Sequence, residues 1–86
     1  MAWELLLAKE ALRFLERLRD EALKTRLWEA LEALKADPFH PVAIKMSGPG
    51  QLYRVRVGGY RIVYEVDQGR LRVLVVKIGK RGDVYR

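Results

Sequence analysis

The sequence of 86 residues has no cysteine and a single histidine, His40. The missing cysteines exclude disulfides, thiolate chemistry and cysteine-bound zinc, and a lone histidine without clustered carboxylates does not make a metal site. No apolar run approaches the roughly 18 residues of a membrane span. Residues 1–4 carry an acid where a signal peptide needs positive charge. We therefore expect a cytoplasmic protein with no metal, cofactor or membrane partner.

Acidic residues are scarce in the second half of the chain. Residues 1–40 contain seven Lys and Arg against eight Asp and Glu, a balance of −1, whereas residues 41–86 contain ten against three, a balance of +7. A chain of this length is expected to form one domain, residues 1–86, with one two-layer core. The asymmetry predicts a polyanionic partner on one side of the molecule. Nucleic acid is slightly favoured over an acidic protein partner or plain solubility.

The first half has the apolar period of helices. Asp20 is a candidate N-cap for a second helix, and Asp37-Pro38 ends that helix because the residue before proline avoids the helical region. The short link predicts an antiparallel helix hairpin that serves as a scaffold. Residues 2–7 could be a strand or the start of the first helix, since periodicity does not separate the two. Apolar residues at steps of three and four define the first helix: Ala8, Ala11, Leu12, Leu15 and Leu18.

Residues 37–50 hold all three prolines and two of the seven glycines, which indicates a connector. His40 lies in this connector, where a lone histidine is more often a surface residue than a catalyst. From Gln51 the apolar period changes to two. That change predicts three strands: residues 53–57, 60–67 and 70–78.

Gly58-Gly59 fixes the pairing of the first two of these strands. A two-residue hairpin loop, for which glycine supplies positive φ, places Arg56 opposite Arg61, with Arg54 on the same face. Like charges directly opposite each other cost stability, and guanidinium groups match phosphate oxygens. We therefore favour an anion site at Arg54, Arg56 and Arg61 over a solvated charged face. The other face carries residues that can pack under the helices: Val55, Val57, Tyr60, Ile62 and Tyr64.

Gln68-Gly69 is the candidate turn between the next two strands. If its loop also has two residues, Asp67 opposes Arg70 and Glu65 opposes Arg72, and these acids neutralise the far end of the arginine face. Four apolar residues are also expected on that face and need a cover: Val63, Leu74, Val76 and Ile78. The cover could be the N-terminal strand or the tail of this chain, or a segment of a partner protein.

Basic residues continue into the C-terminal tail. Lys80 and Arg81 follow the third strand, and Tyr85 lies near the end of the chain. A terminal tyrosine is usually a packing anchor. A phenol beside several cations could instead exchange protons with RNA.

Four segments follow the helix pair in a specific order: Tyr53-Arg54-Val55-Arg56, Gly59-Tyr60-Arg61-Ile62-Val63-Tyr64, Gly79-Lys80-Arg81 and Asp83-Val84-Tyr85. With this order and spacing, the chain resembles the RelE branch of the RelE/ParE toxins over essentially its whole length. The resemblance implies an α+β fold in which a two-helix hairpin packs on a small antiparallel β-sheet, in the order β-α-α-β-β-β. It favours a strand for residues 2–7.

The resemblance also implies an activity and partners. RelE-type toxins of type II toxin–antitoxin systems are mRNA interferases: they cleave messenger RNA in the ribosomal A site, where the 2′-hydroxyl attacks the adjacent phosphate without a metal or cofactor. A cognate RelB-like antitoxin wraps and silences the toxin. The pair binds promoter DNA through the antitoxin. An antitoxin segment is thus one candidate cover for the apolar residues of the arginine face.

The family's functional positions fall on named residues of this chain. Arg54 and Arg56 match basic residues that contact the scissile phosphate or activate the nucleophile. Arg61 matches an arginine that stabilises charge in the transition state. Arg81 matches one that contacts the phosphate or leaving group, and Tyr85 matches a tyrosine that stacks on a base or moves a proton. The RNA-binding candidates beside these catalytic ones are Lys45 and Lys80.

The chain departs from the family at one point. The best-known members have lysine at the positions of Arg54 and Arg56, and arginine effectively cannot lose its proton. The general base could then be another group, or electrostatic stabilisation of the phosphorane could carry most of the rate. The candidates for the base are, in order, Tyr85, Lys80, Lys45 and His40.

Two other functions stay open. One is a ParE-like inhibitor of DNA gyrase, although ParE members generally lack the full set of basic residues and tyrosine. The other is a catalytically weak homologue that only binds antitoxin or RNA.

Overall fold

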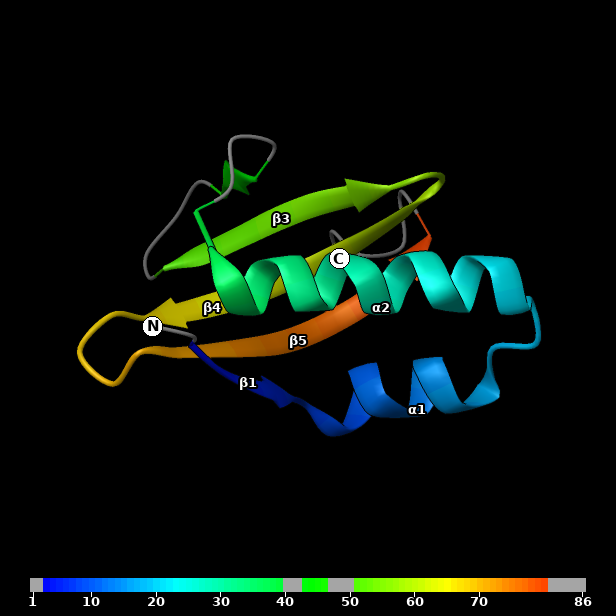
Figure 1. The fold of residues 1–86 in the computed structure, drawn as a ribbon, viewed down its shortest axis with the longest axis horizontal. Helices are drawn as coiled ribbons and strands as arrows, with labels where there is room; N and C mark the ends of the chain where they lie inside the picture. The colour runs from blue at the N-terminus through cyan, green and yellow to red at the C-terminus, as the bar shows by residue number, and fades with distance from the viewer. Residues whose placement is uncertain (1–2, 40–42, 47–50, 81–86) are drawn as a thin grey trace.

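The computed structural model describes residues 3–39, 43–46 and 51–80, so His40, Arg81 and Tyr85 lie outside the described residues. Figure 1 shows the helices and the sheet that they accompany. The α+β class and the two-helix arrangement are confirmed, and residues 4–7 form a strand. The elements in chain order are β1 (Glu4–Leu7), α1 (Lys9–Arg17), α2 (Glu21–Ala36), β2 (Ile44–Lys45), β3 (Leu52–Val57), β4 (Tyr60–Asp67) and β5 (Arg72–Lys80). Within the described ranges, no helix is long and apolar enough to span a membrane.

The sheet has the strand order β1-β5-β4-β3-β2. It differs from the expected antiparallel sheet in two ways. First, β1 runs parallel to β5, with Glu4 beside Arg72; no hairpin turn joins these strands, so nothing local imposes an antiparallel direction. Second, Ile44 and Lys45 form the extra strand β2 inside the predicted connector. Two residues are too few to give a period-two signal.

The helix boundaries follow local chemistry. Asp20 caps α2 as predicted, because its Oδ1 accepts a hydrogen bond from the Leu23 N–H at 3.1 Å. The helix ends at Ala36, and its C-cap, Asp37, directly precedes a proline. The start of α1 has no side-chain cap; instead the Ala8 N–H donates to the Val75 carbonyl at 2.8 Å, which carries the chain directly from β1 into the helix.

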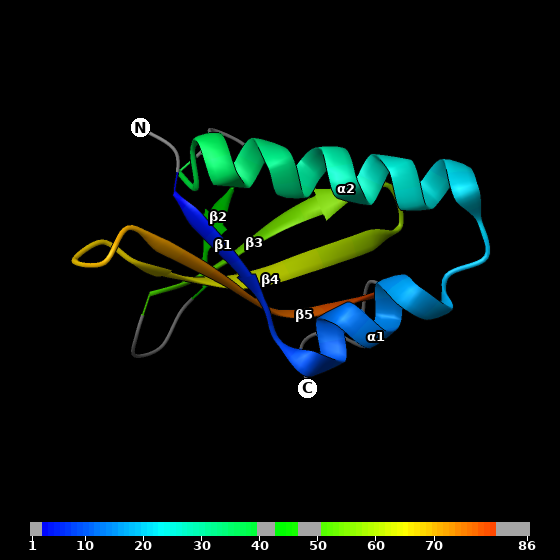
Figure 2. The same cartoon turned by 60° about the horizontal axis from the view of Figure 1, so that its bottom comes forward.

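The two helices cover different parts of the sheet. Figures 1 and 2 show α2 extending across one face and α1 lying alongside β5. The sheet residues under the helices form the core, as the period-two register predicted, and each large apolar side chain buried there contributes about 1.5–3 kcal/mol. The fully buried members include Leu15, Leu27, Leu31, Leu34, Ile62, Tyr64, Val66, Val73 and Val75.

Tyr64 ties the sheet to the end of α2. Its hydroxyl donates a hydrogen bond to the buried Pro38 carbonyl at 2.7 Å. Its ring stacks on Tyr53 with centroids 5.8 Å apart, and Phe39 meets Tyr53 edge-on at 5.4 Å. Burial, with smaller effects from Tyr53 and Asp37, raises the pKa of the Tyr64 phenol. The core therefore favours the neutral form of the Tyr64 phenol.

The turn predicted at Gln68-Gly69 is wrong in length. β4 ends at Asp67 and β5 begins four residues after the loop starts, so the loop spans residues 68–71. The Asp67 carboxylate accepts a hydrogen bond from the Arg70 N–H at 3.2 Å, and Leu71 adopts a positive φ of 53°. The side chain of the aspartate thus stabilises a wider turn than the glycine alone predicts.

The wider loop changes the ion pairs expected beyond it. Asp67 opposes Arg72, and Glu65 opposes Leu74, so the predicted pairings with Arg70 and Arg72 are both wrong. Arg72 instead donates from Nε to the Glu4 carboxylate at 2.6 Å, across the parallel β1–β5 pair. The acid that neutralises this arginine comes from the first strand.

A bulge in β5 changes which residues share the arginine face. Val76 is the extra residue, because Tyr64 pairs with Val75 while Val63 pairs with Lys77. Such a bulge shifts the alternation of the strand by one position.

The shift moves Ile78 off the arginine face. Ile78 pairs with Ile62 and is buried in the core, so its predicted place was wrong. Lys77 takes a place on the arginine face instead. Leu74 remains on that face, and its partner Leu6 in β1 lies beside it rather than over it. The N-terminal strand therefore does not cover the apolar residues of this face.

Candidate functional site

The β3–β4 hairpin brings three arginines together as predicted. Arg56 pairs directly with Arg61, and Arg54 pairs with Val63 two positions further from the turn. Paired residues share a face, and these lie on the face opposite the core. The three arginines and Ile44 line one hollow of about 270 Å³, which we call the arginine hollow.

The arginine hollow combines positive charge with partial burial. Arg54 and Arg61 are half-buried and Arg56 is exposed. No carboxylate is among the described residues that line it. Guanidinium groups held at such a site offer several N–H donors in fixed planes, which suits the non-bridging oxygens of a phosphate. The geometry therefore fits an anion with several oxygens.

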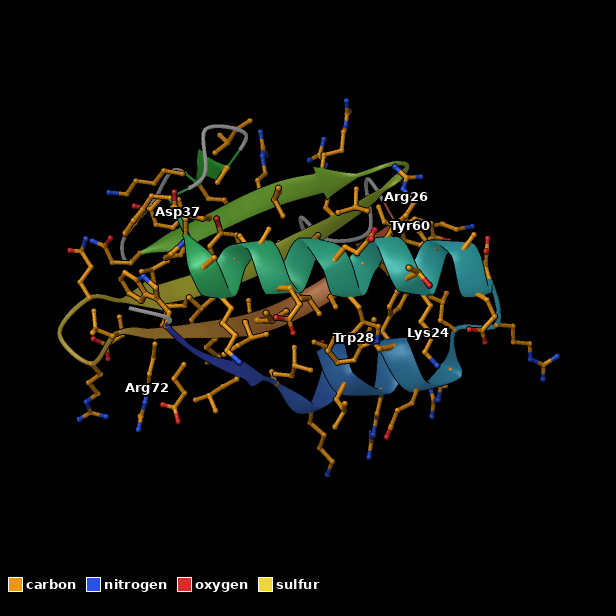
Figure 3. All side chains as sticks on the ribbon, in the orientation of Figure 1. Lys24, Arg26, Trp28, Asp37, Tyr60 and Arg72 are labelled. Carbon is orange, nitrogen blue, oxygen red and sulfur yellow. The ribbon has the colours of Figure 1, made fainter. Side chains whose placement is uncertain are left out.

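The turn of the hairpin needs glycine and carries a further cation. Gly58 has a φ of +60°, and a Cβ placed there would lie 3.4 Å from Nη1 of Arg26. Figure 3 shows Arg26 reaching from α2 toward this end of the hairpin, near Tyr60. The sequence pattern assigned the helices to scaffold, so Arg26 was missed. Only the fold brings this helical arginine to the turn.

The two lysine candidates do not line the arginine hollow. Lys45 pairs with Tyr53, so its neighbour Ile44, which pairs with Arg54, takes the position on the arginine face. Lys80 pairs with Tyr60, on the face that the core residues share. Ile44 is 53% exposed, and a two-residue strand gave no sequence signal for it.

Three candidates lie outside the described residues: Arg81, Tyr85 and His40. Their predicted roles stay predictions. Among the residues that are described, no group of three or more His, Cys, Asp or Glu side chains is placed to hold a metal ion.

Comparisons with known proteins show which family this chain belongs to. The model of the ParE toxin of type II toxin–antitoxin systems, parDE, matches residues 5–85. A RelE-like toxin protein of Escherichia coli is 32% identical over 89 residues, which cover 99% of this chain and 92% of that protein. The mRNA interferase toxin RelE of Escherichia coli strain K12 is 35% identical over 69 residues, covering 76% of this chain and 67% of the relative. The chain belongs to the RelE/ParE superfamily and is a toxin of a type II toxin–antitoxin system.

The fold agrees with a solved structure. The crystal structure of the archaeal RelE–RelB complex from Pyrococcus horikoshii OT3 contains a chain that matches with a TM-score of 0.81 and 29% sequence identity. The match covers 95% of this chain and 98% of that chain. The resemblance identified in the sequence is therefore confirmed at the level of family and fold.

Proposed function

We propose that this toxin is a ribosome-dependent endoribonuclease that acts in the cytoplasm and cleaves messenger RNA in the A site. The observation that carries the proposal is the arginine hollow, where Arg54, Arg56 and Arg61 meet on the face opposite the core. The similarity to an mRNA interferase toxin supports it. On this proposal the hollow binds the scissile phosphate.

The proposed reaction needs no metal. The 2′-oxygen forms a bond to phosphorus while the bond from phosphorus to the 5′-oxygen breaks, which leaves a 2′,3′-cyclic phosphate and a 5′-hydroxyl. The 2′-hydroxyl gives its proton to a base, and the leaving 5′-oxygen receives one. Negative charge grows on the non-bridging oxygens as the phosphorane forms, and preorganised guanidinium donors stabilise that charge more than the ground state.

The residues divide this work by their chemistry. Arg54, Arg56 and Arg61 remain protonated, so they stabilise charge rather than accept the proton, with Arg61 assigned to the transition state. Arg81 is assigned to the phosphate or leaving group. Tyr85 is the first candidate for the proton transfer, followed by the lysine and histidine candidates: Lys80, Lys45 and His40.

The proposed partners follow from the same family. A cognate RelB-like antitoxin binds the toxin, as RelB does in the Pyrococcus horikoshii complex, and promoter DNA is bound through the antitoxin. Leu74, a partly exposed apolar residue of the arginine face, is a candidate for contact with an antitoxin segment, whereas Val63 is only 5% exposed and is already covered.

The test is to incubate the protein with translating ribosomes and to map new 5′ ends on the messenger RNA. We expect cuts within the A-site codon that carry a 5′-hydroxyl. Cuts that appear only on free RNA, or no cuts at all, would contradict the ribosome-dependent mechanism.

A second candidate is inhibition of DNA gyrase, because the family model that matches is that of ParE. A supercoiling assay with purified gyrase separates the two functions. Loss of supercoiling without A-site cuts would favour the ParE-like function, and A-site cuts with normal supercoiling would favour the endoribonuclease.

A further inference from the structure

A second hollow, of about 390 Å³, lies between α1 and β5, and we call it the α1–β5 hollow. Its cations are Arg13 and Arg17, one turn apart on α1, and Lys77 of β5. The rest of its lining is apolar except for one acid: Phe14, Leu18, Ile78 and Glu10. The sequence pattern assigned α1 to a scaffold, so only the fold reveals this grouping.

The geometry of β5 creates this hollow. β1 pairs with β5 no further than Val75, so the strand beyond it has no neighbouring strand on that side in the described chain. Figure 2 shows α1 lying alongside β5, which it contacts. A helix packed beside a strand leaves a channel between them. Its apolar lining, which we call the apolar floor, is formed by Phe14, Leu18 and Ile78.

The charges in the hollow are arranged for an anion. Arg13 and Arg17 are like charges at i and i+4, which destabilise a helix on their own. Within the described residues, neither they nor Lys77 form an ion pair. With Glu10 counted, the lining keeps an excess of two positive charges. A hollow with cations above an apolar floor suits a ligand that is part anion and part ring, such as a nucleotide.

Lys77 joins this hollow to the arginine hollow. It pairs with Val63, which pairs with Arg54, so all three side chains lie on one face of the sheet. Arg54 and Lys77 are two strands apart, or about 10 Å at the usual strand spacing. A single RNA strand can therefore extend from one hollow to the other across this face, with Arg54 and Lys77 as the cations on either side of Val63.

We propose that the α1–β5 hollow binds a flanking nucleotide of the RNA strand whose scissile phosphate occupies the arginine hollow. Arg13, Arg17 and Lys77 bind its phosphate. The base or ribose packs on the apolar floor at Phe14. This inference rests on the proposed function and adds a specific subsite to it. RNA is favoured over an acidic peptide for two reasons. A base or ribose can pack on the apolar floor, and Lys77 lies on the face that the arginine hollow shares, so one nucleotide chain can reach both hollows.

The experiment measures binding of 2′-O-methyl RNA, which cannot undergo 2′-hydroxyl attack, to the whole protein by fluorescence anisotropy. A decanucleotide should bind wild type about fivefold or more tightly than a trinucleotide, since stacking of one added base is worth at least that much. The double variant Arg13→Ala/Arg17→Ala should abolish most of this length gain. The slope of log affinity against log salt for the decanucleotide should fall by about 0.7 for each phosphate that the variant no longer binds.

The matched control is Lys9→Ala/Lys35→Ala, which removes the same charge from exposed helix positions outside the hollow. The control should keep the length gain and the salt slope. Equal thermal unfolding temperatures of both double variants exclude a folding defect. If Arg13→Ala/Arg17→Ala binds the decanucleotide like the control, the inference is overturned. It is also overturned if the variant keeps the RNA length gain and loses affinity only for a polyglutamate peptide.

The outcomes separate this inference from the proposed function, because binding and ribosomal cleavage are measured independently. Loss of A-site cleavage in Arg61→Ala together with an unchanged length gain in Arg13→Ala/Arg17→Ala would remove the subsite and keep the endoribonuclease. The opposite result is also possible: wild type makes no A-site cuts, and Arg13→Ala/Arg17→Ala loses the length gain. That result would support the RNA subsite and contradict the proposed reaction.

Discussion

The two faces of the sheet differ in burial and charge, and adjacent residues of one strand belong to different faces. Ile62 is fully buried in the core, whereas Arg61 beside it lies on the opposite face in the arginine hollow. The same alternation separates Val55 from Arg54 and Arg56. One period-two register thus supplies both the surface that packs in the core and the surface that carries the arginine hollow. Changes at neighbouring positions should therefore act on different measurements.

The largest expected effect is on the core face. Ile62→Ala should lower the free energy of unfolding by about 2–5 kcal/mol, because it leaves a cavity at a fully buried site. Arg61→Ala should change it by no more than about 1 kcal/mol, because it removes only one of two like charges that oppose each other at the surface. Urea denaturation followed by circular dichroism measures both. If both variants lower the free energy of unfolding equally, the arginine face contributes to stability as much as the core face does.

The next effect tests the hydrogen bond under α2. Tyr64→Phe should cost about 1–3 kcal/mol, because the buried Pro38 carbonyl loses its donor. The raised pKa of the Tyr64 phenol also predicts a pH dependence. Its contribution is fully present below the ordinary tyrosine pKa of about 10 and is lost as the pH rises further.

Unfolding midpoints measured from neutral to alkaline pH check this pH dependence. Wild type should lose more stability above about pH 10 than Tyr64→Phe does. Parallel curves for the two proteins would contradict the assigned burial of the phenol.

The smallest effect has opposite signs at two arginines of the same face. Arg56→Ala should raise stability by about 0.2–1 kcal/mol, because it removes a like charge directly opposite Arg61. Arg72→Ala should lower it by about 0.2–1 kcal/mol, because Arg72 pairs with Glu4 at the surface. Thermal unfolding at low salt compares them, and the difference should shrink at high salt. If Arg56→Ala lowers the stability instead, repulsion between Arg56 and Arg61 does not destabilise the fold.

The features that could be predicted from the sequence are those set by residues close together in the chain. The hairpin register at Gly58-Gly59, the Asp20 cap and the core positions of the hairpin agree with the structure. Each rests on neighbouring residues whose chemistry acts locally. The three arginines could be assigned to one face for the same reason.

The features that were missed depend on contacts between distant segments. The bulge at Val76 and the pairing of Arg72 with Glu4 require β5 to be placed between two strands. Ile44 enters the arginine hollow through a strand of two residues, too short for a pattern. Arg26 reaches the hairpin turn from a helix that the sequence assigned to scaffold. Tertiary packing decides these positions, and no local signal encodes them.

The arginine hollow is proposed to stabilise the transition state of RNA cleavage on the ribosome. The direct measurement is the single-turnover rate of A-site cleavage by Arg61→Ala, with Arg70→Ala in the 68–71 loop as the matched control outside the hollow. We expect a loss of about 10²- to 10³-fold for Arg61→Ala and a wild-type rate for Arg70→Ala. A wild-type rate for a folded Arg61→Ala protein would show that the arginine hollow does not act in the transition state.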